Sequence, residues 1–155
     1  FKRYLKMTTL TRTTSENIDF QMLTALFDEY LVEIDGEEKD FFAQFNQIYL
    51  EYVVVCYENG IAVGCGAFKK LEKNQVEIKR MFVHPNYRNI GIANLVLSEL
   101  EIWAKQLENT SCILETSFKL ESAIALYKKS GFKIISNYGQ YKDVESSVCM
   151  KKILK

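Results

Sequence analysis

The segment between Val76 and Trp103 constrains the fold most, because its hydrophobic pattern changes period within a few residues. Residues 76–83 are rich in β-branched and apolar side chains, which is typical of a strand. After Pro85, apolar residues recur every three or four positions, at Ile92, Val96, Leu100, Trp103 and Leu107. That spacing predicts an amphipathic helix of about four turns with one face toward a core. A strand followed by such a helix is typical of a sheet covered by helices.

Upstream of this segment, the patterns predict a strand, two helices and two further strands. The first helix is indicated by helical spacing of Ile18, Met22, Leu26 and Tyr30, with Thr13 and Glu16 spaced as a capping box. Asn59-Gly60 favours a tight hairpin between the two later strands. The expected elements are a strand at Thr8–Arg12, a helix ending at Asp35-Gly36, a helix at Glu37–Ile48, and strands at Tyr52–Tyr57 and Ile61–Lys70.

Downstream, strands and one helix alternate to the end of the chain. The expected elements are a strand at Cys112–Thr116, a helix at Glu121–Ser130 ended by Gly131, and strands at Phe132–Ser136 and Ser147–Ile153. The complete order is strand, helix, helix, three strands, helix, strand, helix, strand, strand. This order predicts an α/β (α+β) fold, with a mixed, mostly antiparallel central sheet of about six to seven strands and helices on both faces.

Composition excludes several classes of protein. The 155 residues fit a single domain, which we expect over residues 7–155, with residues 1–6 vector-derived or disordered. Twenty basic and twenty acidic residues give no net charge, which argues against a nucleic-acid binder. The four cysteines form no CxxC pair and there is one histidine, so we expect no metal site. Without an apolar run of about 18 residues, we expect no membrane span and a cytoplasmic protein.

The turn Arg88-Asn89-Ile90-Gly91-Ile92-Ala93 lies between the strand and the helix. A helix N-terminus presents unpaired N–H groups and the positive end of the helix dipole. Gly91 and Ala93 leave room for a phosphate to approach these groups, and Arg88 adds a positive charge. The turn therefore suggests a phosphate or pyrophosphate site. The alternative is a tight turn at Gly91 and a solvated Arg88.

The RxxGxA turn after a strand, followed some thirty residues later by ALYKKSGF, resembles the GNAT superfamily of N-acetyltransferases. The resemblance implies acetyl-CoA as co-substrate, with its pyrophosphate held by backbone N–H groups of the turn. It also implies that the main chain of the preceding strand binds the pantetheine arm and the acetyl carbonyl. The positions that match are Met81, Phe82, Val83, Arg88, Asn89, Gly91, Ile92, Ala93 and Tyr127.

Acetyl transfer to an amine needs a base and an acid, because an alkylammonium has a pKa of about 10.4 and the leaving thiolate must gain a proton. In the resembling family, the tyrosine of LYxxxGF commonly protonates the CoA sulfur, which makes Tyr127 the expected acid. The alternative is a core aromatic residue on an amphipathic helix. Glu77, on the strand before the turn, is the expected base, directly or through a water; a structural salt bridge or a solvated strand residue is the alternative. Glu115 is a further carboxylate near the end of the next strand.

Two positions depart from the family pattern. Leu120 stands where many members carry an asparagine that contacts the cofactor, and Asn89 stands where many have glycine. Neither change removes the backbone cradle. An acyl-enzyme route through Cys65 or Cys149, with His84 as partner, is the less favoured chemistry, because most buried cysteines behave as small hydrophobic residues.

The acceptor side is the least specified by sequence. In the family, the first two helices and the loop between the last two strands usually line the acceptor pocket. We therefore expect Tyr30, Tyr138 and Tyr141 to contact the acceptor, and the same regions contain Phe41, Phe45 and Ser147. The leading hypothesis is an N-acetyltransferase that acts by direct transfer to a primary amine of a small molecule or peptide. The alternatives are a non-catalytic acyl-CoA sensor or interaction module and, more weakly, another nucleotide-binding domain; a homodimer stays open.

Overall fold

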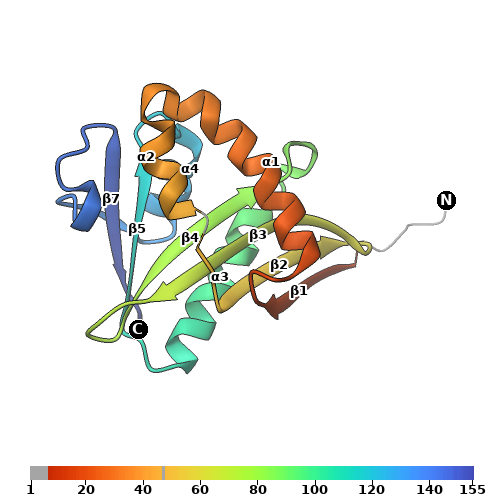
Figure 1. Ribbon diagram of the computed structural model, residues 1–155. Coiled ribbons are helices and arrows are strands. Elements are labelled where there is room, and N and C mark those ends of the chain that lie inside the picture. The colour runs from red at the N-terminus through yellow and green to blue at the C-terminus, as the bar shows by residue number, and fades with distance from the viewer. Residues whose placement is uncertain (1–6, 47) are drawn as a thin grey trace. The chain divides into compact units, whose positions relative to one another are not determined.

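Seven strands form a sheet in the order β1-β2-β3-β4-β5-β7-β6 (Figure 1). The structure is a computed structural model that describes residues 7–46 and 48–155, without the side chains of Phe45 and Asn46. The expectation for residues 1–6 lies outside the described residues. β1 pairs antiparallel with β2, as do β5 and β6 with β7, whereas β4 and β5 run parallel. The predicted fold class is confirmed.

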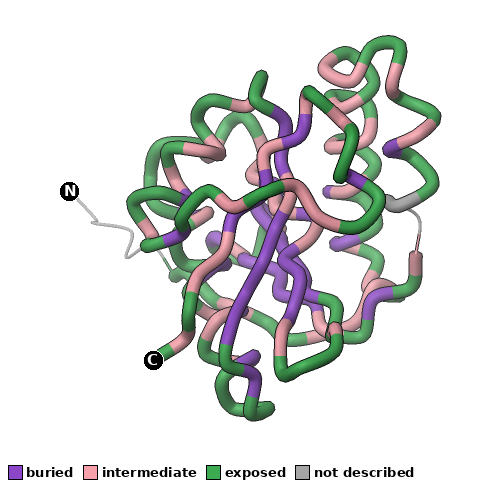
Figure 2. The backbone as a smooth tube through the Cα atoms, turned by 90° about the vertical axis from the view of Figure 1, so that its left-hand side faces the viewer, coloured by how far each residue is buried: buried purple, intermediate pink, exposed green. Residues whose placement is uncertain are grey.

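Most element bounds follow the sequence pattern closely, but the helix expected at Glu37–Ile48 is wrong in its bounds, because a 3-10 turn at Gly36–Glu38 precedes an α-helix at Lys39–Asn46. The strands are β1 Thr8–Thr13, β2 Tyr52–Glu58, β3 Ile61–Lys70, β4 Gln75–Val83, β5 Ser111–Ser117, β6 Lys133–Ile135 and β7 Ser147–Ile153. The α-helices are α1 Ile18–Asp35, α2 Lys39–Asn46, α3 Ile92–Gln106 and α4 Glu121–Lys129. Short 3-10 turns occupy Gly36–Glu38, Pro85–Tyr87 and Gly139–Tyr141. Buried residues are most frequent in β2, β3 and β5 and are seen as purple stretches in Figure 2, whereas β1 and β6 contain only intermediate and exposed residues.

The chain contacts divide into two units. The first unit contains residues 1–67 and 80–100, and the second contains residues 68–79 and 101–155. Strands β3 and β4 and helix α3 therefore each contribute residues to both units. The expectation of one domain over residues 7–155 stays a prediction.

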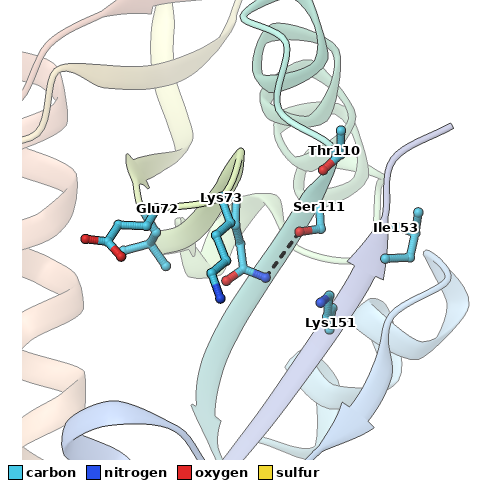
Figure 3. A pocket seen from close by; sticks show the side chains of 8 residues that line it. Glu72, Lys73, Thr110, Ser111, Lys151 and Ile153 are labelled. Atoms are coloured by element: carbon cyan, nitrogen blue, oxygen red, sulfur yellow. Dashed lines mark hydrogen bonds between the residues drawn. The ribbon is translucent and has the colours of Figure 1, made fainter.

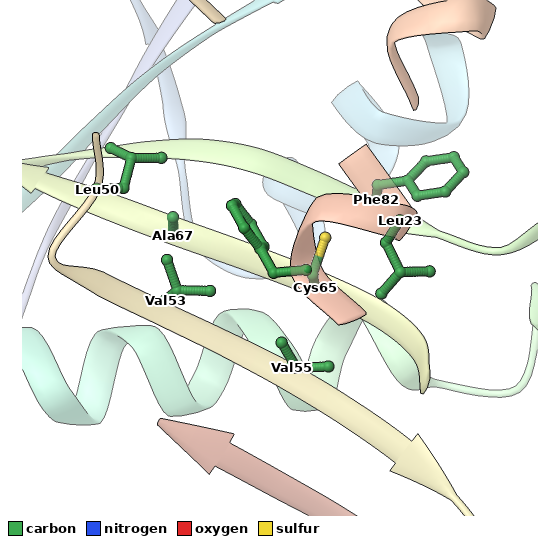
Figure 4. Close-up of a cluster of buried hydrophobic side chains, with 8 residues drawn as sticks. Leu23, Leu50, Val53, Val55, Cys65, Ala67 and Phe82 are labelled. Atoms are coloured by element: carbon green, nitrogen blue, oxygen red, sulfur yellow. The ribbon is translucent and has the colours of Figure 1, made fainter. Parts of the chain in front are cut away.

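In the first unit, α1 packs on a core of strand residues. The buried cluster comprises Phe20, Leu23, Leu50, Val53, Val55, Cys65, Ala67 and Phe82 (Figure 4). Gly64 and Gly66 stand two positions apart in β3. A Cβ at Gly66 would lie 2.5 Å from Met81 Sδ and 2.9 Å from Val96 Cγ1 of α3. These glycines let α3 approach the sheet closely, which larger side chains would prevent.

The start of α1 differs from the prediction. The N-cap is Asn17, whose Oδ1 accepts a hydrogen bond from Phe20 N at 2.9 Å. The expected capping box at Thr13 and Glu16 is wrong, because Thr13 is the last residue of β1 and pairs with Val53. Thr13, which the local pattern assigned to the start of the helix, belongs instead to the pairing of β1 with β2.

The stripe that predicted α1 is also not its buried face. Ile18, Met22, Leu26 and Tyr30 are exposed, and the helix is anchored by Phe20 and Leu23 instead.

In the second unit, the register places a set of polar residues on one face. Glu77 of β4 pairs with Ile113 of β5, and Glu115 of β5 pairs with Cys149 of β7. Because side chains alternate along a strand and directly paired residues share a face, Glu77, Glu115 and Cys149 lie on the same side.

Candidate active site

The turn before α3 has the backbone of an anion-binding loop. Asn89 and Gly91 adopt left-handed conformations, with φ of 64° and 89°. Asparagine tolerates this conformation better than most residues, so Asn89 provides what glycine provides elsewhere. A Cβ at Gly91 would meet no atom within 4 Å, and α3 begins at the next residue. Left-handed turns at a helix N-terminus direct successive N–H groups toward one point, which suits a phosphate.

Arg88 folds back onto the end of β4. Its Nε donates to Val83 O at 3.0 Å. The guanidinium carbon lies 5.8 Å from the ring centre of Tyr30 and 5.7 Å from that of Phe82. These contacts hold the positive charge beside the turn, and they bring together two residues, Tyr30 and Arg88, that the sequence had assigned to different partners.

Strand β4 contains one left-handed residue, Arg80, which has φ of 59°. A left-handed residue inside a strand ends the regular alternation of side chains. The alternation that sets Glu77 and Lys79 together therefore does not continue into Met81, Phe82 and Val83. In the first unit, the Phe82 ring stacks on Phe27 of α1, with ring centres 5.2 Å apart.

Glu77 is a buried carboxylate with two close partners. Tyr138 Oη donates to Glu77 Oε2 at 2.5 Å, and Lys79 Nζ lies 3.5 Å from Oε1. Burial first, and the Glu77 charge second, raises the pKa of Tyr138 above its ordinary value, so this phenol stays a donor. The Tyr141 ring meets the Tyr138 ring edge to face at 5.8 Å. The structure thus brings together three of the predicted residues, Glu77, Tyr138 and Tyr141.

Lys79 and Asn137 were assigned no role from the sequence. Lys79 stands two positions after Glu77 on β4, so strand alternation places both side chains on one face. Asn137 donates to Val144 O at 3.0 Å and to Ser147 O at 3.1 Å, which fixes the β6–β7 loop that carries Tyr138. No local signal distinguishes Asn137 from an ordinary turn residue.

Glu115 and Tyr127 form the second part of this unit's polar interior. Ser147 Oγ donates to Glu115 Oε1 at 2.9 Å. Tyr127, on α4, is buried and packs edge to face on Phe132 at 5.7 Å. Burial, and then the Glu115 charge, raises the pKa of Tyr127 above its ordinary value. The hydroxyl therefore stays protonated at neutral pH, as a proton donor must.

Comparison with known proteins assigns this chain to a family. The family model described as "Acetyltransferase (GNAT) family" matches residues 20–132. This chain belongs to the GNAT family. An IAA acetyltransferase of Azospirillum brasilense is 35% identical over 102 residues, which span 65% of this chain and 67% of that protein. An uncharacterised N-acetyltransferase of Schizosaccharomyces pombe is 29% identical over 130 residues, 77% of this chain and 78% of the relative.

Solved GNAT structures show the same fold. A Klebsiella pneumoniae protein described as an acyl-CoA N-acyltransferase superposes with a TM-score of 0.82 and 28% identity, covering 96% of this chain and 99% of the other. The PaiA N-acetyltransferase of Thermoplasma acidophilum, solved with coenzyme A, superposes with a TM-score of 0.66 and 19% identity, over 95% and 99% of the two chains. The GNAT family and the relatives' names identify this chain as an acyltransferase.

The GNAT loop of this chain fits a CoA pyrophosphate by its own geometry. The space at Gly91 is open, and the first N–H groups of the adjoining helix α3 are donors that a phosphate can accept from. At the other motif, Leu120 is the N-cap of α4 and makes no side-chain capping bond. The leucine side chain has no amide group with which to contact the cofactor.

A cleft of about 590 Å³ lies away from the residues predicted by sequence, at the start of β5 (Figure 3). Gln75 and Ser111 line it and share a 3.1 Å hydrogen bond, two register positions before Glu77 and Ile113. The cleft therefore opens on the same sheet face as Glu77, although no residue predicted to act in the GNAT reaction lines it.

The cysteine and histidine alternatives fit this GNAT domain poorly. Burial raises the pKa of Cys65 to about 12 and also raises that of Cys149, so both thiols stay protonated at neutral pH. His84 Nδ1 accepts from Asn86 N at 3.1 Å and caps a 3-10 turn. Its position is explained by the turn alone.

The remaining acceptor residues are placed in part. Phe41 meets Phe42 edge to face at 5.1 Å, whereas the side chain of Phe45 lies outside the described residues. Within residues 7–46 and 48–155, no group of three metal-ligating side chains occurs and no helix is long and apolar enough to cross a membrane.

Proposed function

We propose that this GNAT domain moves the acetyl group of acetyl-CoA to a primary amine of a small molecule or peptide, by direct transfer in a ternary complex. The observation that carries the proposal is Gly91, left-handed and open on its Cβ side at the start of α3. An anion can approach the helix N-terminus there without displacing a side chain. Arg88, Asn89, Ile92 and Ala93 complete this pyrophosphate cradle.

The main chain of Met81, Phe82 and Val83 binds the pantetheine arm and the thioester carbonyl. Backbone N–H groups aimed at the carbonyl oxygen stabilise the negative charge that develops when the amine attacks. The left-handed Arg80 directly precedes this segment, which supports a main chain released from regular strand pairing.

Glu77 is the base that takes a proton from the acceptor ammonium, directly or through a water, so that the neutral amine can attack the thioester. Tyr138 holds Oε2 by a short hydrogen bond, and Oε1 faces Lys79 at a longer distance. A buried carboxylate oriented in this way stays in one rotamer, which is what proton transfer to a positioned group requires. Tyr30, Tyr138 and Tyr141 contact the acceptor.

Tyr127 is the acid that protonates the departing CoA sulfur. The carbon–sulfur bond breaks as the new carbon–nitrogen bond forms, and the phenol proton goes to the thiolate. Burial keeps the phenol neutral until that step, because its pKa is raised. The four cysteines are free and buried, which supports a reducing compartment such as the cytoplasm as the setting.

The test begins with calorimetric titration of acetyl-CoA and of desulfo-CoA into the protein. A thiol-release screen over small amines, polyamines, amino acids and peptides follows. Binding with turnover on one amine class is the expected result. Binding without turnover would favour a non-catalytic acyl-CoA sensor, and absence of binding would refute the role of the Gly91 loop.

A further inference from the structure

The side chain of Arg80 is buried yet only half satisfied. Its exposed fraction is 4%, and Nη2 donates to Thr24 O at 3.1 Å and to Asp28 Oδ1 at 2.8 Å. Among the buried side-chain polar atoms of the described residues, Arg80 Nη1 has no hydrogen-bond partner. Buried donors in native proteins are nearly always paired, so this one calls for an explanation.

The position of Arg80 is also conformationally costly. A non-glycine residue at φ of 59° inside a strand is rare, and such strain concentrates at functional sites. The Phe27 ring covers one face of the guanidinium, with the carbon 5.1 Å from the ring centre. The ring therefore covers one face of the guanidinium of this left-handed residue.

Asp28 leaves part of the guanidinium fork unused. Its Oδ1 lies on Nη2, while Nη1 is unpaired, so the pair does not use both terminal nitrogens. The Asp28 side chain is 43% exposed, so it can exchange its contact for water at low cost. A second carboxylate that reaches both Nη1 and Nη2 would form the bidentate geometry for which a guanidinium is suited.

We infer that Arg80 binds a carboxylate of the acceptor through Nη1, and that the acceptors are therefore carboxylate-bearing amines of the amino-acid type. This inference rests on the proposed N-acetyltransferase function. Asp28 and Phe27, the α1 side chains that contact the guanidinium, are only partly buried, so this part of α1 borders solvent. Arg80 is thus a specificity-determining residue.

The first experiment needs no variant. Amino acids are compared as acetyl acceptors with their amides and with the matching decarboxylated amines, by kcat/KM from thiol release. A charge-assisted bond to a buried guanidinium predicts a preference of about tenfold to hundredfold for the carboxylate-bearing member of each set. Equal kcat/KM across the sets, or a preference for the amines without a carboxylate, would overturn the inference.

Variants then assign the preference to Arg80. Arg80→Met is expected to bring the ratio between carboxylate-bearing and decarboxylated acceptors close to one, and Arg80→Lys to restore part of it. Arg12→Met is the matched control, because Arg12 is a partly exposed arginine of the same unit, paired with Glu99. A ratio unchanged in Arg80→Met would mean that Nη1 binds only water.

A binding readout separates this inference from the proposed function. Titration of the same amino acids and amines in a thermal-shift assay requires no acetyl-CoA. Stabilisation of the wild type by amino acids, absent in Arg80→Met and kept in Arg12→Met, supports the carboxylate site even if no acetyl transfer is found. Absence of stabilisation in the wild type, together with equal kcat/KM values, would reject it.

Discussion

Substitution of Gly91 by glutamate tests the CoA loop directly, and the chain provides a matched control at Gly60. Gly91 has φ of 89° and Gly60 has φ of 82°, and a Cβ at either position meets nothing within 4 Å. A glutamate at either site therefore carries the same left-handed strain, about 1–2 kcal/mol, and the same added charge. Only Gly91 lies at the start of α3, where the pyrophosphate is expected to bind.

The expected loss of affinity follows from electrostatics. A glutamate at about 4 Å from a phosphate charge is repelled by about 4 kcal/mol at an effective dielectric constant of about 20. That energy corresponds to about three orders of magnitude in Kd. Calorimetric titration with acetyl-CoA should show this loss in Gly91→Glu and near wild-type binding in Gly60→Glu, with similar thermal unfolding of the two variants. Equal affinity in both variants would refute the loop assignment.

Three further predictions concern the proposed acid, the proposed base and the buried thiols. Tyr127→Phe should lower kcat by about 100-fold or more while the calorimetric Kd for acetyl-CoA stays unchanged; an unchanged kcat would remove Tyr127 from the mechanism. Glu77→Gln should lower kcat to a similar extent, and activity that is retained across the pH profile would show that another group is the base. Burial raises the pKa of Cys65 and Cys112 from 9.0 to about 12. Stability from a raised folded pKa is complete below the unfolded pKa and is lost as pH rises toward the folded value. At about pH 10, each buried thiol should therefore lower the free energy of unfolding by about 1.4 kcal/mol. Urea unfolding at about pH 8 and pH 10 measures this loss, and Cys112→Ala should reduce it; an identical loss in the variant would contradict the assignment to the thiols.

The order of elements could be predicted because each strand and helix has its own hydrophobic period. The bounds of β3 agree with the prediction, and those of β2, β5 and α4 differ from it by one residue at one or both ends. The N-terminus of α1 could not be predicted in the same way. Thr13 carries a valid capping signal, but pairing with Val53 of β2 has a larger effect than a local hydrogen bond. A four-residue sequence pattern contains no information on the strand pairing of Thr13 with a distant residue.

The candidate site likewise has one part that local sequence predicts and one part that depends on tertiary contacts. The loop at Gly91 was predictable, because its glycine, its helix and its preceding strand are contiguous in sequence. The contact between Glu77 and Tyr138 joins residues 61 positions apart, and no local rule sets a partner at that distance. The resemblance to the GNAT family indicated both residues, but only the fold shows that the Tyr138 hydroxyl donates to the Glu77 carboxylate.

Arg80 shows why departures from local rules are informative here. Glycine would adopt φ of 59° without the strain of about 1–2 kcal/mol that an arginine incurs in the left-handed region. Phe27, Thr24 and Asp28 all contact the guanidinium, so these interactions offset the strain in the folded state. They use Nη2 and the ring face, and they leave Nη1 unpaired among the described residues. A residue selected only to hold α1 against β4 would gain nothing from a second buried nitrogen without a partner, since an unmade buried bond costs about 1–3 kcal/mol. The unpaired nitrogen therefore points to a ligand that completes the fork.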